Sequence, residues 1–333
     1  MRNILKFSLI FIAIFSIIIY SAIPSLGASS ISICNLYKKS EKQKRTKELT
    51  NYCDNKYYGE QDQGAPISFF ENAKPIQKTE PVKWDKLDEG LYLGEFYSTK
   101  KSNAPISPII ILKISPKFYS FILMSASENE GKARTLKQWC NQFNAVAAIN
   151  ASMYLKENNL KSTGYMKNYN YFNNPDINNS FGAFMAFNPI DDSLPYVQII
   201  DRYHQPWKKL IGKYNTVIQN YRMISLHGEN VWKLTDKAYS TTAVGMDKDG
   251  NVLFIYSMSP HTTYDLNNVL LSLPIKIKNA MYVEGGQEAN LYIKNQKRMS
   301  EKKEGYKSDF TEHNNKKSVW KVPNVIGIVK RKR

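Results

Sequence analysis

The sequence has 333 residues and a formal net charge of +17 at pH 7, with 42% hydrophobic and 23% charged side chains. This charge favours anionic partners such as phosphate-bearing glycans or an anionic membrane surface. The chain carries no RNP-like motif, helix-turn-helix pattern or zinc finger, so no nucleic acid partner is expected. Its three cysteines are too few for a disulfide scaffold or a typical zinc site. No other metal-ligand spacing stands out, and we expect neither a metal nor a cofactor.

Residues 1–28 have the pattern of an export signal. Arg2 and Lys6 precede residues 7–23, a run without charged side chains, and residues 24–28 supply the small side chains that a signal peptidase requires. One interpretation is cleavage after position 27 or 28. The other is an uncleaved membrane anchor, because the run approaches the ~20 apolar residues that span a bilayer. In both cases we expect an exported protein: periplasmic, extracellular or anchored to the outer face of the cytoplasmic membrane.

Residues 29–80 are predicted to be a basic, flexible tether. Lysine and arginine are dense between positions 38 and 47, and no sustained apolar period follows. Such a segment cannot bury enough apolar surface to offset the entropy cost of ordering it, so it is expected to be disordered. Cys34 and Cys53 could form a disulfide in an oxidising compartment and leave Cys140 buried. Three unpaired cysteines are the alternative.

From position 81 onwards the pattern changes to short apolar runs separated by turn residues, and we expect one folded domain at 81–333. In its first half, strands are predicted at 108–114 and 118–124. A helix is predicted at 135–143, where apolar side chains recur at i, i+3, i+4 and i+7. This helix leads into an apolar strand at 145–149.

The second half of the predicted domain also contains a hairpin, a helix and a buried strand. An Asp-Gly dipeptide at 249–250 lies between two apolar runs and predicts a β-hairpin, because it readily adopts positive φ. Asp265 is the expected N-cap of a helix that Pro274 ends, and apolar strands are predicted at 280–283 and 325–329. The expected fold class is α+β: a mixed twisted β-sheet with flanking helices, in a single domain behind the disordered N-terminal tether.

A first polar loop follows the strand at 145–149. It begins with Asn150, Ser152 and Tyr154, whose amide and hydroxyl groups suit the hydroxyls of a sugar, since both kinds of group can donate and accept hydrogen bonds. A loop held by local turns of its own asparagine side chains is the competing interpretation. The loop is therefore a candidate ligand-binding segment.

A second polar loop follows the strand at 280–283. Partial burial of Glu284 at the strand end could raise the pKa of its carboxyl into the range of a general acid. Gly285 and Gly286 allow a steep turn or a close approach of the backbone to a ligand, and Gln287 adds a polar side chain. A solvated carboxylate at a strand end is the alternative.

Three motifs follow one another in the chain: Asn-Ala-Ser-Met-Tyr at 150–154, a segment that begins at Thr242 and ends at position 250, and Asn-Ala-Met-Tyr-Val-Glu-Gly-Gly at 279–286. Their order and spacing resemble the phosphodiester glycosidase family. The resemblance implies hydrolysis of the bond between a sugar and a phosphodiester-linked phosphate. It also implies that Asn150 and Tyr154 bind sugar or phosphate and that Glu284 is the catalytic acid or base.

The sequence departs from the family pattern at three of these positions. Ser152 replaces a glycine, and Glu284 is one methylene longer than the family's aspartate. Thr241 stands where the family has an arginine, the residue suited to clamping a phosphodiester by charge-assisted bonds. Arg222, Arg202 or a lysine from another segment could supply the missing positive charge.

His261 lies between a predicted strand and the helix that begins near Asp265. It could face the same two loops as an acid or base, and an ordinary surface histidine is the alternative.

From the residues and the resemblance we expect an exported hydrolase that cleaves a sugar-1-phosphodiester in envelope or extracellular glycans. Because the motif residues are altered, the enzyme could be inactive, and a non-catalytic glycan- or phosphate-binding protein on the same scaffold is the alternative. A third hypothesis is a basic envelope protein that acts mainly through its tether.

Overall fold

The computed structural model describes residues 83–97, 108–155, 158, 160–294 and 320–332. The chain divides into two compact units, Met1–Gln77 and Lys78–Arg333, and all described residues belong to the second. The predicted export signal, the tether and the Cys34–Cys53 pair therefore lie outside the described residues. Cys140 is a free, buried cysteine, as expected. None of the helices in the described part of the chain is long and apolar enough to cross a membrane.

The largest sheet of the described domain has seven strands in the order β1-β2-β3-β13-β12-β14-β11, and every neighbouring pair is antiparallel. Its strands are β1 Trp84–Asp88, β2 Leu91–Phe96, β3 Ile109–Ile114, β11 Arg222–Ile224, β12 Ala238–Asp247, β13 Val252–Thr262 and β14 Ile277–Gly285.

Two smaller sheets are also antiparallel throughout, one of five strands in the order β7-β6-β10-β8-β9 and one of four in the order β15-β5-β16-β4. The five strands are β6 Met166–Asn168, β7 Tyr171–Asn174, β8 Ala183–Pro189, β9 Val197–Asp201 and β10 Tyr214–Asn220. The four strands are β4 Tyr119–Ser125, β5 Ala147–Asn150, β15 Leu291–Ile293 and β16 Asn324–Lys330.

One hydrophobic core is shared by all three sheets. In β3, Ile110 and Leu112 face this central core, whereas Ile109 and Ile111 face a second cluster on the other side of the sheet. Both faces of the strand are therefore buried, which explains why the sequence shows a continuous apolar run here rather than an alternating one.

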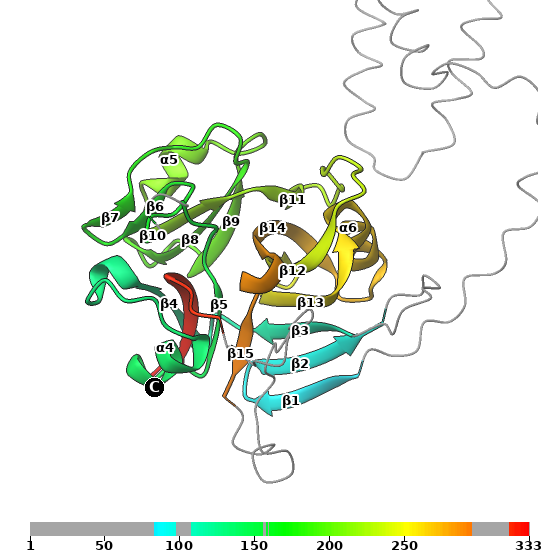
Figure 1. Cartoon of the computed structure of the whole chain (residues 1–333), viewed down its shortest axis with the longest axis horizontal. Helices are drawn as coiled ribbons and strands as arrows, with labels where there is room; N and C mark the ends of the chain where they lie inside the picture. Colours follow the sequence, from blue (N-terminus) through cyan, green and yellow to red (C-terminus); the bar gives the residue numbers. More distant parts are fainter. Residues whose placement is uncertain (1–82, 98–107, 156–157, 159, 295–319, 333) are drawn as a thin grey trace, which may run out of the picture. The chain divides into compact units, whose positions relative to one another are not determined.

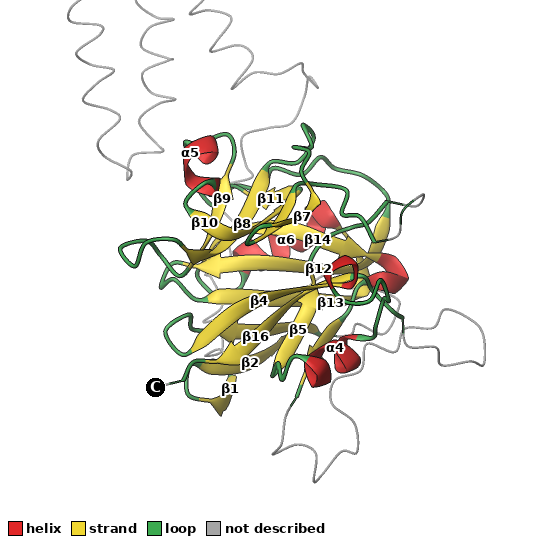
Figure 2. Cartoon of the chain, turned by 90° about the vertical axis from the view of Figure 1, so that its left-hand side faces the viewer, coloured by secondary structure: helices red, strands yellow, loops and turns green. Residues whose placement is uncertain are grey.

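Three short helices cover the outer faces of the sheets (Figures 1 and 2). They are α4 Leu136–Gln142, α5 Trp207–Ile211 and α6 Thr263–Ser272. Apolar side chains of α4 pack against the four-stranded sheet, those of α5 against the five-stranded sheet and those of α6 against the seven-stranded sheet. Two 3-10 turns complete the described helices: η1 Ala126–Glu128 and η2 Gly286–Glu288.

At the start of α4 and of α6, a threonine side chain accepts the hydrogen bond of a backbone N–H group that has no partner within the helix. Thr135 and Gln138 form a capping box at α4. At α6 the N-cap is Thr262 rather than the expected Asp265. The Asp265 backbone N–H donates to Thr262 Oγ1 at 3.0 Å, and the Thr262 hydroxyl lies 3.0 Å from the Asp265 carboxylate. Asp265 thus lies in the first turn, where a carboxylate opposes the positive end of the helix dipole.

The β-hairpin predicted from the Asp-Gly dipeptide joins β12 to β13. Gly250 has φ of 83°, a conformation that glycine adopts without strain. The Asp247 carboxylate accepts the backbone N–H groups of Asp249 and Asn251 at 3.0 and 2.8 Å, which fixes the turn.

The α+β class and every predicted strand and helix of the domain are confirmed. The expected single mixed sheet is instead three sheets whose described strand pairs are all antiparallel. The expected sheet differs from the observed ones because an apolar run predicts where a strand lies but not which strands it pairs with. Strand β5, for example, pairs with β15 and β16, which come from the far end of the chain.

Candidate functional site

Glu284 lies near the end of β14, and the residue is only 8% exposed. Burial raises the pKa of its carboxyl to about 8, because the charged form is poorly solvated there. The Gly285 N–H, 3.0 Å from Glu284 Oε1, partly offsets this rise, and the nearby Glu288 carboxylate adds to it. The sequence prediction of a buried carboxyl with a raised pKa is therefore confirmed.

Asn150 and Thr242 connect the first polar loop to Glu284 through hydrogen bonds. Asn150 is buried at the end of β5, where its Nδ2 donates to the Glu288 carbonyl at 2.9 Å and its Oδ1 accepts the Asn290 N–H at 2.7 Å. Thr242, paired with Glu284 across β12 and β14, places its hydroxyl 3.3 Å from both Asn150 Oδ1 and the Glu284 carbonyl oxygen. Residues far apart in the sequence thus meet at one place.

Two tyrosines lie within electrostatic range of the carboxylates. Burial raises the pKa of Tyr154, and the charges of Glu288 and Glu284 raise it further. Burial likewise raises the pKa of Tyr282, followed by the charge of Glu284. Both hydroxyls therefore stay protonated and can donate hydrogen bonds beside Glu284.

The loop at 285–287 requires its two glycines. A Cβ at Gly285 would collide with the Tyr282 hydroxyl. Gly286 has φ of 72°, and its carbonyl accepts the Ser240 hydroxyl at 2.7 Å. Gln287 is exposed on η2. The positive φ of Gly286 fits the steep turn expected of the glycine pair, and the close approach to a ligand stays a prediction.

Ser152 and Asn220 are buried beside this cluster, and each has a polar atom without a hydrogen-bond partner: Ser152 Oγ and Asn220 Oδ1. Asn220 Nδ2 donates to the Ala151 carbonyl at 2.9 Å, which holds the first polar loop to the end of β10. Unpaired buried polar atoms cost free energy, so Ser152 on the loop and Asn220 at the end of β10 are shaped for something other than packing alone.

An aromatic row leads up to Tyr282. Phe181 packs on Tyr221 with ring centroids 4.3 Å apart. Tyr221 contacts Trp232, and Trp232 contacts Tyr282, each at 5.5 Å between centroids. This row gives the site an apolar side next to the buried carboxyl.

The two arginines considered as replacements for the missing family arginine are bound elsewhere. Arg222 Nη1 lies 3.0 Å from both carboxylate oxygens of Asp201, and its guanidinium stacks on Tyr203. Arg202 donates to the backbone carbonyls of Asn178, Asn179 and Phe181. These placements give the predicted phosphate-binding role of Arg222 no support.

Thr241 and His261 lie at the margin of the cluster. Thr241 is buried opposite Gly285, and its hydroxyl lies 3.4 Å from the Tyr239 carbonyl oxygen of its own strand. His261 Nδ1 is 3.0 Å from Ser257 Oγ on β13, which β12 separates from β14. Thr241 therefore stays in the candidate site through its backbone position, whereas His261 is one strand removed from Glu284.

Sequence reasoning missed three members of the site. The sequence predicts Tyr282 only as part of a buried strand, and it gives no role to Asn220 or to Glu288. The signal that could have identified Tyr282 is its separation of two residues from Glu284, since strand residues two apart share a face. Within the described residues, no group of three or more His, Cys, Asp and Glu side chains is placed to hold a metal ion.

Comparison with known proteins supports the resemblance. The family model for phosphodiester glycosidase matches residues 143–329, which include Asn150, Thr242 and Glu284. No curated protein sequence matches the chain significantly.

Two solved structures share the fold. A hypothetical protein from Synechocystis aligns with a TM-score of 0.51 and 14% identity over 76% of this chain and 64% of its own length, so the chain spans less than two thirds of that protein. The catalytic domain of zebrafish N-acetylglucosamine-1-phosphodiester alpha-N-acetylglucosaminidase, auto-inhibited by its pro-peptide, aligns with a TM-score of 0.52 and 13% identity over 76% of this chain and 85% of its own. At these identities the similarity is one of fold.

Proposed function

The chain belongs to the phosphodiester glycosidase family, and from this premise we propose that it hydrolyses a sugar-1-phosphodiester in an envelope or extracellular glycan. The observation that carries the proposal is the buried Glu284 carboxyl, with its raised pKa, on a residue whose backbone carbonyl accepts the hydroxyl of Thr242, which also bonds Asn150. A carboxyl that is protonated near neutral pH is suited to act as a general acid.

In the proposed reaction, water attacks the anomeric carbon, the bond from that carbon to the phosphate oxygen breaks, and a phosphomonoester leaves. Glu284 donates a proton to the departing oxygen. Glu288, the other carboxylate within electrostatic range, is the candidate to receive the proton of the attacking water. The hydroxyls of Tyr154 and Ser152 bind sugar or phosphate oxygens. The backbone at Gly286 gives the substrate room to approach, since Tyr282 fills the space beside Gly285.

The test is the release of free sugar from synthetic sugar-1-phosphodiesters. We expect Glu284→Gln, which keeps the shape and removes the acid, to lower kcat by about 100-fold or more. Glu95→Gln changes an exposed carboxylate on β2 and serves as the control. Unchanged turnover in Glu284→Gln would show that Glu284 is not the acid.

A second candidate function is glycan or phosphate binding without catalysis. The observation in its favour is that Thr241 occupies the arginine position while Asp201 neutralises Arg222. Calorimetry would then detect binding of several sugar phosphodiesters that the wild-type protein does not hydrolyse. Measurable hydrolysis of any of them excludes this candidate.

Export is also a proposal, and residues 1–28 support it by their charge and apolar pattern. Mass spectrometry of the protein from fractionated cells tests it. An exported chain that begins after position 27 or 28 indicates cleavage, and an exported chain that retains residue 1 indicates an anchor. Recovery of the full chain in the cytoplasm would contradict the proposal.

A further inference from the structure

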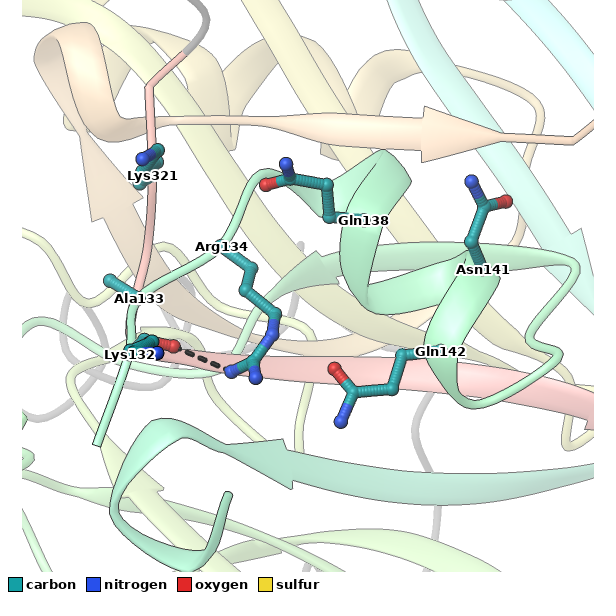
Figure 3. Close-up of a pocket in the computed structure, with 7 residues that line it drawn as sticks. All are labelled: Lys132, Ala133, Arg134, Gln138, Asn141, Gln142 and Lys321. Atoms are coloured by element: carbon teal, nitrogen blue, oxygen red, sulfur yellow. Dashed lines mark hydrogen bonds between the residues drawn. The ribbon is translucent and has the colours of Figure 1, made fainter. Parts of the chain in front are cut away.

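A basic depression lies beside α4. None of its lining residues belongs to the Glu284 cluster, which consists of Glu284, Asn150 and Thr242. The depression has a volume of about 600 Å³ and is lined by Lys132 and Arg134 from the segment before α4, by amide side chains of α4, and by Lys321 from the segment before β16 (Figure 3). Its lining before position 143 precedes the residues that the family model matches. Lys321 lies within the matched residues, and the match assigns no role to it or to the depression.

The charge of the depression is positive and partly fixed in place. The Arg134 guanidinium donates to the backbone carbonyls of Asn129 and Lys132, pairs with Glu130 at 2.9 Å, and stacks on the Trp139 ring. Lys132 and Lys321 are exposed, and neither forms an ion pair with a carboxylate in the described part of the chain. Glu130 offsets one of three positive charges, so the remaining two are available to an anion.

Amide groups add donors to this charge. Gln138, Asn141 and Gln142 line the depression from α4. The Gln138 carbonyl oxygen already accepts the Thr135 N–H at 3.0 Å in the capping box, which leaves the Gln138 NH2 group for a ligand. Lysine ammonium groups together with amide N–H groups are donors that suit phosphate oxygens and sugar hydroxyls.

The depression and the Glu284 cluster lie at the same end of the four-stranded sheet. Arg134 forms a β-bridge with Val322, and three residues later Val325 pairs with Asn150. At about 3.3 Å per strand residue, the two pairings are about 10 Å apart. Trp320, next to Lys321, is near enough to Tyr154 to lower the pKa of its hydroxyl, which the charges of Glu284 and Glu288 raise.

We propose that the basic depression binds a second phosphate of the substrate, so that the protein acts on chains that carry repeated sugar phosphodiesters. This inference rests on the proposed hydrolysis at Glu284. Its positive charge acts on the neighbouring phosphate and not at the Thr241 position, where the family arginine is absent and Arg222 is bound to Asp201. The depression holds the neighbouring phosphate of the chain while the bond at the Glu284 cluster is cleaved.

The experiment compares a synthetic trimer of a sugar-1-phosphodiester with its monomer, using Lys132→Gln/Lys321→Gln. Calorimetry gives the affinity of the full chain for each probe, and sugar release gives kcat and KM. We expect the double variant to weaken trimer binding and raise the trimer KM by about tenfold, since two exposed charge contacts contribute together about 1.4 kcal/mol. The kcat for both probes and the KM for the monomer should stay within about twofold of wild type.

The matched control is Lys137→Gln/Lys209→Gln, which removes the same charge from exposed lysines outside the depression. Equal loss of trimer affinity in both double variants would overturn the proposal, because net charge alone would then explain it. Binding of anionic phospholipid vesicles through Lys132 and Lys321, without trimer binding, would also overturn it. Lys132→Arg/Lys321→Arg should restore trimer affinity, which separates a binding role from misfolding.

The two proposals can fail separately. If the wild-type protein hydrolyses neither probe but still binds the trimer through Lys132 and Lys321, the hydrolysis at Glu284 is wrong and the phosphate site stands. If it hydrolyses trimer and monomer with the same KM, the phosphate site is wrong and the hydrolysis stands.

Discussion

The Glu284 carboxyl is buried at a strand end, so the free energy of charging it affects the stability of the fold as well as its chemistry. Its folded-state pKa of about 8 lies above the ordinary value of 4.5. Because the folded pKa is raised, the protonated group's contribution is fully present below about pH 4.5 and is lost as the pH rises through about 8. Between these limits the folded protein keeps a proton that the unfolded chain releases, so the unfolded state gains stability as the pH rises.

Glu284→Gln should remove this pH dependence. We expect the free energy of unfolding of the wild type, relative to the variant, to fall by about 1.4 kcal/mol for each pH unit across that window. Denaturant unfolding at pH 5, 7 and 9 measures it, with Glu95→Gln as the exposed control. Parallel curves for wild type and Glu284→Gln would mean that the carboxyl ionises in the folded state as easily as in water.

The same residue also predicts the pH profile of catalysis. If Glu284 is the general acid, activity should fall as the pH rises through about 8. An activity that rises across that range would instead indicate that the carboxylate acts as a base.

At the scale of the elements, Asp201 joins two sheets. It lies at the end of β9 in the five-stranded sheet and binds Arg222 of β11 in the seven-stranded sheet. Burial raises the pKa of Asp201, but hydrogen bonds from His204, from the Leu226 and Tyr203 N–H groups and from Arg222 outweigh it and hold the pKa below its usual range. The lowered pKa means that this contribution to stability is present above about pH 4 and is lost as the pH falls through the folded value.

Asp201→Asn should therefore destabilise the domain by about 3 kcal/mol at pH 7, because it leaves the largely buried Arg222 without its counter-charge. The difference from wild type should shrink below about pH 4, where Asp201 itself is neutralised. Thermal and denaturant unfolding at pH 7 and pH 3 measure both effects. Asp249→Asn breaks an exposed pair with Lys276 and should cost under about 1 kcal/mol; an equal cost for the two variants would contradict the bridging role of Asp201.

The elements also show what a sequence can and cannot predict. Apolar runs and helical periodicity predicted β3, β4, α4, β5 and α6, because the buried positions of these elements carry apolar side chains. The strands β6 to β11 escaped prediction. Strands β6 and β7 are short and lie where the chain is rich in asparagine and tyrosine, whereas β8 has seven residues and a buried apolar run that was overlooked. Strand neighbours escaped as well, since pairing such as that of β5 with β16 depends on packing across the whole domain.

The candidate site was also predicted only in part: single residues were predicted from the sequence, but most of their neighbours in space were not. Asn150 and Glu284 were predicted to belong together because each ends an apolar strand, and hydrogen bonds through Thr242 connect them. The basic depression was not predicted, because Arg134 and Lys321 become neighbours only through a bridge between distant segments. Local sequence carries the chemistry of single groups, whereas long-range pairing decides which groups meet.

At the scale of the whole domain, the three sheets share one core, and Phe121 lies where they meet. Its ring, from the four-stranded sheet, contacts Phe187 of the five-stranded sheet and Phe254 of the seven-stranded sheet, each at 6.1 Å between centroids. No sheet can lose its inner face without exposing apolar surface on the other two. The described domain should therefore unfold as one cooperative unit rather than sheet by sheet.

Phe121→Ala tests this cooperativity. The cavity left by a fully buried ring should cost about 3–5 kcal/mol, and the loss should appear equally in all three sheets. Fluorine-labelled tryptophan NMR during denaturant unfolding can report it, because Trp84, Trp139 and Trp207 pack on different sheets. Phe172→Ala, at an exposed position of β7, should cost under about 1 kcal/mol. If the three tryptophans in Phe121→Ala unfold at different denaturant concentrations, the sheets are separate folding units and the shared core does not couple them.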